Sequence, residues 1–330
     1  MIWSKKFDAK LKKFMTKKNL TITALVAAGL VTFWFAGGGT FLKEVFSSRA
    51  GGANEEENID VSKFLRPDQC TSVYPWGPPK IKDKIVNERS LYMCRNSYAI
   101  QYDTKIKVPL WEVEILNKKN LVQFNIPSNM VPSLDPEVPK KMQGKMEDFA
   151  KAGYMMGFLA PIQNMYINNS NMPYEQLEQV NREALQQSLY LTSVVPETKA
   201  ANNIRRQIDD EARRIVMQRN ELFLVSGPVF LNGQTKGFIG EGDNQVAVPT
   251  HIYKIMTDPL TYGSIAYIIP NEQVLNCGGQ ACNLENFIVP IKEVERVTGI
   301  EFYSKLAPYY AVQVKQDVNE VFKNKRNQNQ

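Results

Sequence analysis

His251, the single histidine of the chain, limits the chemistry that these 330 residues can perform. Most catalytic zinc sites and many general-base mechanisms use imidazole, so one histidine removes nearly all of them. Tyr154 and Tyr166 are poor bases at neutral pH, because an unperturbed phenol has a pKa of about 10. We interpret His251, in the sequence Val-Pro-Thr-His, as a structural residue within a strand.

Four cysteines form the other chemically distinctive group. Cys277 and Cys282 enclose Gly-Gly-Gln-Ala, a short loop that a disulfide would close in an oxidising compartment. Cys70 with Cys94 is a second candidate pair. Free thiols and zinc are the alternatives, although zinc needs four nitrogen or sulfur ligands and the chain offers few.

The pattern of residues 110–116 predicts a strand. Trp111, Val113 and Ile115 alternate with Glu112 and Glu114. This alternation is typical of a half-buried strand, with one apolar face and one polar face.

The other expected elements follow in mixed order. Helical composition covers Tyr174–Leu189 and, more strongly, Ala200–Asn220. Further strands are predicted at Ser97–Tyr102, Leu222–Val225, Gln245–Ile255, Ile265–Ile269 and Phe287–Ile291, with helices at Lys292–Val297 and Ala307–Phe322. No strand–helix unit repeats, which favours an α+β fold.

The formal charge of +6 is concentrated at the N-terminus. Residues 1–18 contain seven lysines and one aspartate, and the other 312 residues carry 33 basic and 33 acidic side chains. A nucleic-acid-binding domain usually has a basic surplus, so we expect nucleic acid not to be a partner. A local patch could still form from Arg205, Arg206, Arg213 and Arg214.

Residues 20–42 predict a transmembrane helix. They are 23 residues without a charge, bracketed by Lys18 and Lys43, and about 20 apolar residues suffice to cross a bilayer. Small residues recur every four positions within this segment, at Ala24, Ala28, Thr32 and Ala36. Such a stripe suits close packing against another helix, although small residues are also common in transmembrane helices generally. The Lys-rich residues 1–19 predict an amphipathic or targeting segment on the cytoplasmic or matrix side, and 43–82 a linker and extended arm.

Several ordered segments resemble the DNA/RNA non-specific endonucleases with a ββα-metal site, the family of mitochondrial endonuclease G. They are Ser97-Tyr-Ala-Ile-Gln-Tyr-Asp, Leu110-Trp-Glu-Val-Glu, Ser226-Gly-Pro-Val-Phe-Leu, Val246-Ala-Val-Pro-Thr-His, Tyr267-Ile-Ile-Pro-Asn and Glu293-Val-Glu-Arg-Val-Thr-Gly. The resemblance implies an endonuclease G-like domain over 83–305, followed by a C-terminal helix and tail over 306–330.

The family signature Asp-Arg-Gly-His-Leu-Ala-Pro corresponds here to residues 155–161, Met-Met-Gly-Phe-Leu-Ala-Pro. In the family the histidine is the general base, and Phe158 has no lone pair with which to accept a proton. Met155 and Met156 replace the aspartate and the cationic arginine. We therefore expect no catalytic residues at these positions and an inactive nuclease-like protein.

The metal-binding half of the family pattern is also altered. Ser193 and Glu197 stand where the family has asparagine and glutamine, and Asn202 fits the place of the family's Mg²⁺-binding asparagine. One asparagine is a weak Mg²⁺ site, since the ion prefers several oxygen ligands, and a helix start explains Asn202 equally well. We expect no cofactor, with Mg²⁺ as the alternative.

The resemblance and the predicted span together suggest a single-pass protein of the mitochondrial inner membrane, with its main domain facing the intermembrane space. We expect an inactive accessory subunit of a large membrane complex, of the respiratory chain by preference, in contact with other subunits and with lipid. A homodimer is an arrangement that the family allows. The alternative is an active Mg²⁺-dependent DNA/RNA non-specific endonuclease anchored in that membrane.

Overall fold

The computed structural model describes residues 70, 74, 76–121, 126–127, 129–277, 282–308 and 310–311. No helix within these residues is long and apolar enough to cross a membrane. The predicted span at 20–42, its stripe of small residues, the N-terminal tail and most of the C-terminal helix lie outside the described residues.

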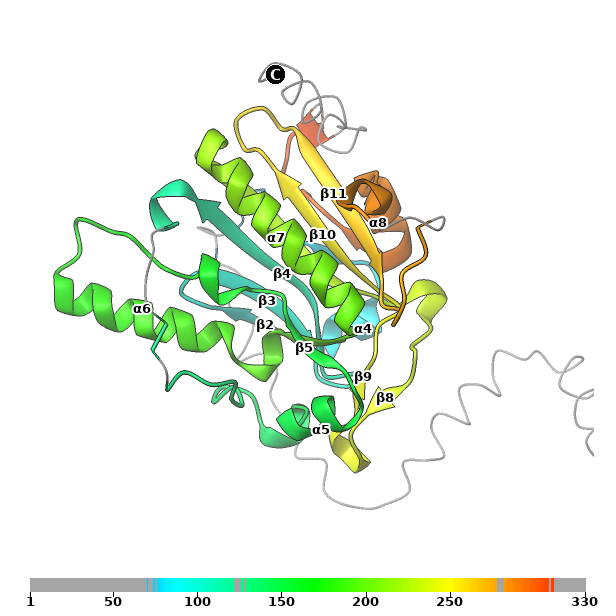
Figure 1. The fold of residues 1–330 in the computed structure, drawn as a ribbon. Coiled ribbons are helices and arrows are strands. Elements are labelled where there is room, and N and C mark those ends of the chain that lie inside the picture. The colour runs from blue at the N-terminus through cyan, green and yellow to red at the C-terminus, as the bar shows by residue number, and fades with distance from the viewer. Residues whose placement is uncertain are drawn as a thin grey trace, which may run out of the picture. The chain divides into compact units, whose positions relative to one another are not determined.

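A seven-stranded antiparallel sheet forms the centre of the described fold (Figure 1). Its strands, in spatial order, are β12 (Ile288–Val289), β11 (Ser264–Pro270), β10 (His251–Thr257), β7 (Glu221–Val229), β4 (Val108–Asn117), β3 (Tyr98–Asp103) and β2 (Ser90–Cys94). Three two-stranded sheets surround it: β1 (Lys80–Ile81) with β13 (Ile300–Glu301), β5 (Met155–Phe158) with β6 (Val194–Glu197), and β8 (Phe238–Ile239) with β9 (Val246–Ala247).

Five α-helices accompany the sheet in the described ranges. They are α4 (Lys84–Glu88), α5 (Met146–Lys151), α6 (Tyr174–Ser188), α7 (Lys199–Arg219) and α8 (Ile291–Thr298). The 3₁₀ helices are η3 (Lys118–Asn120), η4 (Lys140–Met142), η5 (Ile162–Asn164), η6 (Leu191–Ser193), η7 (Leu231–Gly233), η8 (Gly242–Asn244) and η9 (Leu284–Phe287). Helices α6 and α7 match the two predicted long helices to within about one residue at each end, and helices and strands mix without a repeating unit, as expected of an α+β fold.

Both faces of the central sheet are covered, and α7 lies across one of them (Figure 1). Successive strand residues point to opposite faces, so Leu222 and Leu224 pack toward α7 while Phe223 and Val225 pack away from it. We call these two layers the α7-side core and the far-side core. The α7-side core contains Leu116, Leu224, Ile252, Ile204, Ile208 and Ala212, and the far-side core contains Trp111, Val113, Phe223, Tyr253, Ile291 and Val294.

Two strand predictions need correction. Glu112 and Glu114 were expected on a polar face, but they are 0% and 1% exposed because α7 covers that face of the sheet. The apolar run 245–255 is two strands, since β9 ends at Ala247 and β10 begins at His251. Pro249 lies between them, and a proline cannot donate to a strand ladder.

Helix α7 begins and ends at residues with clear signals. Thr198 is its N-cap, and the hydroxyl of Thr198 accepts a hydrogen bond of 3.2 Å from the Ala201 amide. Asn220 ends the helix with φ +71°, a conformation that asparagine tolerates better than most residues. The two signals therefore define where the helix begins and ends.

We predict that Leu224→Ala destabilises the protein by about 2–5 kcal/mol, because Leu224 is fully buried between β7 and α7. Chemical denaturation of the full-length protein measures the change. Leu260→Ala is the matched control, since Leu260 is 78% exposed, and its effect should stay within about 0.5 kcal/mol. Equal effects of the two variants would contradict this arrangement of the core.

Candidate active site

The residues that replace the family signature form β5, which pairs antiparallel with β6. Met155 lies opposite Glu197, and Phe158 lies opposite Val194. Met155 is 48% exposed, whereas Phe158 is half-buried against the α7-side core. The structure therefore brings 155–158 together with Glu197 and with the start of α7, two residues further along the chain.

Gly157 allows β5 to lie directly over the carboxylate of Glu197. A Cβ atom at position 157 would overlap that carboxylate. Glu197 itself is fully buried. Only a residue without a Cβ atom fits at position 157 without displacing Glu197.

Glu197 holds two side chains of α7. Its Oε2 accepts a hydrogen bond of 2.6 Å from Nδ2 of Asn202, and its Oε1 accepts one of 2.6 Å from Nε of Arg205. Arg205 also donates through Nη1 to Asp209 at 2.8 Å. Charge-assisted bonds of this kind are short and fix geometry, so both Asn202 and Arg205 are held in one orientation.

Asp209, which pairs with Arg205, is also bound by a buried lysine between α7 and the sheet. Nζ of Lys254 donates to Oδ1 of Asp209 at 2.6 Å and lies 3.8 Å from Oε1 of Glu114. Asn164 donates to the same Glu114 oxygen at 2.9 Å. Buried charges thus connect β6, α7, β10 and β4.

Carboxyls outnumber cations in this buried group. Four carboxyls (Glu112, Glu114, Glu197, Asp209) face two cations (Arg205, Lys254), all at most 5% exposed. Neither carboxyl oxygen of Glu112 has a hydrogen-bond partner, and the Ser226 hydroxyl opposite it in β7 has none either. Ionising all four carboxyls would leave uncompensated charge in the interior, which is costly.

Burial accordingly favours the protonated form of two of these carboxyls. It raises the pKa of Glu114 to about 7, an effect that Lys254 and the hydrogen bond from Asn164 partly oppose. Burial and the neighbouring Glu114 carboxylate raise the pKa of Glu112 well above its usual range. Because these side chains have no route to solvent, they are unsuited to act as general bases on a substrate.

Asn202 is the described residue best placed to hold a metal ion. The amide nitrogen is committed to Glu197, and no described group donates to its Oδ1. Mg²⁺ is often bound through few protein oxygens and retains several waters, so a single fixed amide oxygen fits it. Within the described ranges, no group of three or more His, Cys, Asp or Glu side chains is arranged for a metal.

His251 is not part of this arrangement. It begins β10 and lies opposite Val229 and Pro270. Alternation places it on the side of Tyr253, away from Lys254 and α7. Burial lowers the pKa of the His251 imidazole, which keeps it neutral at pH 7.

Both candidate cysteine pairs are joined as disulfides in the structure. The Cα atoms are 5.5 Å apart in Cys70–Cys94 and 5.3 Å apart in Cys277–Cys282, within the usual range. None of the four cysteines is free, which leaves no thiol for a zinc site.

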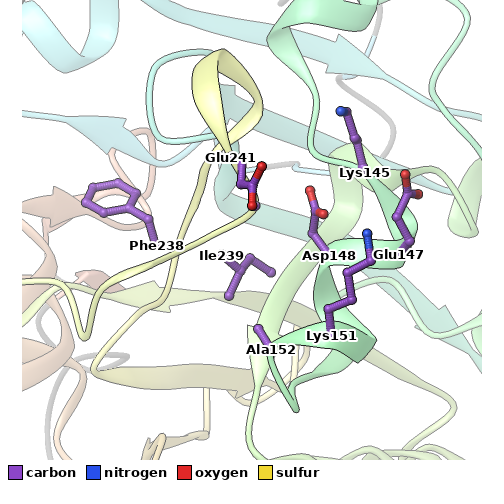
Figure 2. Close-up of a pocket in the computed structure, with 9 residues that line it drawn as sticks. Lys145, Glu147, Asp148, Lys151, Ala152, Phe238, Ile239 and Glu241 are labelled. Carbon is purple, nitrogen blue, oxygen red and sulfur yellow. The ribbon is translucent and has the colours of Figure 1, made fainter.

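A separate pocket of about 340 Å³ lies between α5 and the turn after β8 (Figure 2). Lys145, Glu147, Asp148, Lys151 and Glu241 contribute charges of both signs to its wall. Residues 155–158 and Asn202 do not line it. The pocket is therefore distinct from the β5–α7 site.

Comparison with known proteins decides the family. The sequence model of the DNA/RNA non-specific endonucleases matches residues 81–308, more than half of the chain. The chain belongs to the DNA/RNA non-specific endonuclease family. The matched range includes β5, β6 and α7.

Curated relatives in this family are named as nucleases. The mitochondrial nuclease EXOG of Mus musculus is 26% identical over 288 residues, which covers 81% of this chain and 73% of the relative. The mitochondrial endonuclease G of Bos taurus is 27% identical over 218 residues, which covers 63% of this chain and 67% of the relative. The match to human nuclease EXOG spans 57% of that protein's length.

A solved structure of this family shares the fold. A chain of the crystal structure of an EndoG/EndoGI complex aligns with a TM-score of 0.58 and 20% sequence identity. The alignment covers 72% of this chain and 92% of that one. At this identity the likeness establishes the fold alone.

Two sequence-based expectations are corrected by these relatives. The expectation that the chain is not an enzyme is wrong, because its family is enzymatic and its relatives are nucleases, including Nuclease C1. The expectation of no cofactor is wrong for the same reason, since nucleases of this family are typically Mg²⁺-dependent. The expectation inferred lost activity from altered side chains at Met155, Met156 and Phe158, whereas losing a general base alone typically lowers a rate about 10²–10⁴-fold.

Sequence reasoning also missed the role of Arg205. It grouped this residue with three other arginines as a surface patch, but Arg205 is 5% exposed and bound to Glu197. Eight residues separate the two, and only the turn from β6 into α7 brings them together. Its spacing of four from Asp209 was the one available signal.

We predict that Gly157→Ala lowers the free energy of unfolding by about 1–3 kcal/mol, because the methyl group displaces the Glu197 carboxylate and its two hydrogen bonds. Denaturant titration of the full-length protein measures it. Ala152→Ser, at an exposed position before β5, serves as the control. Unchanged stability of Gly157→Ala would show that β5 does not rest on Glu197.

We predict that stability falls as the pH rises from about 5 to 8 at fixed salt. Glu114 has a folded-state pKa of about 7, above its unfolded value of about 4.3, so its contribution is complete at low pH and is lost as the pH passes 7. Glu114→Gln should reduce this slope by up to about 1.4 kcal/mol per pH unit. Denaturation at several pH values measures it, with exposed Glu88→Gln as the control; identical slopes for wild type and Glu114→Gln would contradict the raised pKa.

Proposed function

We propose that this protein is a Mg²⁺-dependent endonuclease that hydrolyses phosphodiester bonds of DNA and RNA at the surface formed by β5, β6 and the first half of α7. The observation that carries the proposal is the fixed amide of Asn202, whose nitrogen is bound to Glu197 and whose oxygen has no donor. Membership of a nuclease family and relatives named as nucleases support it.

The chain's own residues have separable roles in this proposal. Glu197 orients Asn202, which would hold Mg²⁺, and an ion there would neutralise charge on the phosphate. Gly157 leaves room for Glu197 beneath β5. Arg205 donates to the Glu197 carboxylate at 2.6 Å and offsets its charge in the interior.

Phe158 sets the rate in this proposal. A benzyl group offers no atom that accepts a proton from water, so no side chain at this position assists the attack. Met156 likewise brings no cation to the phosphate. We therefore propose a slow enzyme, about 10²–10⁴-fold below one with a histidine at 158.

The proposed location is the mitochondrion. Support comes from the names of the EXOG and endonuclease G relatives, both mitochondrial, and from the lysine-rich segment before residue 20. We further propose, on sequence alone, that 20–42 anchors the chain in the inner membrane with the nuclease domain in the intermembrane space. We also propose, on sequence alone, that the protein lies beside the subunits of a respiratory complex.

We predict that full-length protein in mild detergent cleaves plasmid DNA and RNA slowly with Mg²⁺ and not with a chelator. Asn202→Ala should abolish the cleavage, because it removes the amide oxygen. Phe158→His should raise the rate by about 10²–10⁴-fold. Gel assays under single-turnover conditions measure these rates.

Phe238→His is the matched control for Phe158→His. It places an imidazole on β8, away from the β5–α7 site, at a side chain that is 52% exposed, and should leave the rate unchanged. Cleavage that survives Asn202→Ala would contradict the proposed role of Asn202 in holding Mg²⁺. A wild-type protein without Mg²⁺-dependent cleavage would overturn the proposed function.

A further inference from the structure

Helix α7 carries cations of two kinds. Four of its arginines are bound to carboxylates: Arg205 to Glu197 and Asp209, Arg213 to Asp210, Arg214 to Glu211 and Arg219 to Asp258. Lys199 and Arg206 are exposed, and no carboxylate lies within ion-pair distance of either in the described part of the chain. Only these two cations of the described helix are free to meet a ligand.

The two free cations share a face of α7 with Asn202. Residues at i, i+3, i+4 and i+7 lie on one side of an α-helix, which places Lys199, Asn202, Asn203 and Arg206 together. Lys199 and Arg206 are separated by about 10.5 Å along the axis, at 1.5 Å per residue. This span suits contact with different phosphates of one nucleic-acid strand.

The electrostatic surroundings leave this face positive. The N-terminus of α7 carries the positive end of the helix dipole, and its first turn contains no acidic residue. Asp210 lies one turn after Arg206 on this face, but its carboxylate is paired with Arg213, as Glu197 is paired with Arg205 and Glu272 with Lys236. Nothing described on the same face therefore cancels Lys199 or Arg206.

We propose that Lys199 and Arg206 bind two backbone phosphates of a nucleic acid and so position the strand across Asn202. They supply from α7 the positive charge that Met156 does not supply from β5. Contacts to phosphate carry no sequence information, so binding at this face is non-specific for base sequence. The inference rests on the proposed function for its consequence in hydrolysis, whereas the binding itself is separable from it.

Fluorescence anisotropy of full-length protein with a labelled DNA duplex, in chelator and at several salt concentrations, tests this inference. Each phosphate contact contributes about −0.9 to the slope of log K against log salt for B-DNA. The double variant Lys199→Gln/Arg206→Gln should therefore flatten the slope by about 1.8. The single variant Arg206→Lys should keep the wild-type slope, because the positive charge at position 206 remains.

The matched control is Lys84→Gln/Arg182→Gln, which removes the same net charge from two exposed residues on α4 and α6. It retains the lysine-rich N-terminal segment, as the test variant does, so any binding through that segment cancels in the comparison. Equal slopes for the two double variants would overturn the inference.

The two proposals fail in different ways. A slope change without any Mg²⁺-dependent cleavage would support phosphate binding and refute the proposed nuclease activity. Mg²⁺-dependent cleavage by the wild type, together with equal slopes for the two double variants, would support the nuclease activity and refute phosphate binding by Lys199 and Arg206.

Discussion

The buried carboxylate of Glu197 is the constraint on which the site depends. It lies beneath Gly157 of β5, at the end of β6, and receives hydrogen bonds from Asn202 and Arg205 of α7. One anion thus fixes the relative positions of three elements. The cost of burying it is offset by two charge-assisted hydrogen bonds, each short and well directed.

The ion pair between Glu197 and Arg205 is connected to further buried charges between α7 and the sheet. Arg205 and Lys254 both donate to Asp209, and Lys254 lies near Glu114. The layer between α7 and the sheet therefore contains a group of buried charges surrounded by apolar side chains. The surplus of carboxyls over cations means that protons are part of this interior at neutral pH, since burial favours the neutral acids.

Sequence predicted the frame of the site better than the state of its side chains. The glycine of the degenerate signature located residues 155–158, and helical periodicity located α6 and α7. Glu112 and Glu114 were assigned to a polar face because alternation alone cannot show that α7 covers the second face of the sheet. Arg205 and Arg206 are neighbours in sequence, yet one is buried and the other exposed, and only the docking of α7 separates their roles.

The disulfide between Cys70 and Cys94 has a mechanical consequence. Cys94 is the last residue of β2, an edge strand of the central sheet, and Cys70 precedes the sheet in the chain and is buried in the far-side core. The covalent link means that tension applied to the chain before residue 70 reaches the sheet at β2 first, bypassing residues 71–93. A tether at the N-terminus would therefore pull on the end of this strand and not on β1 or α4, which lie between the two cysteines in the chain.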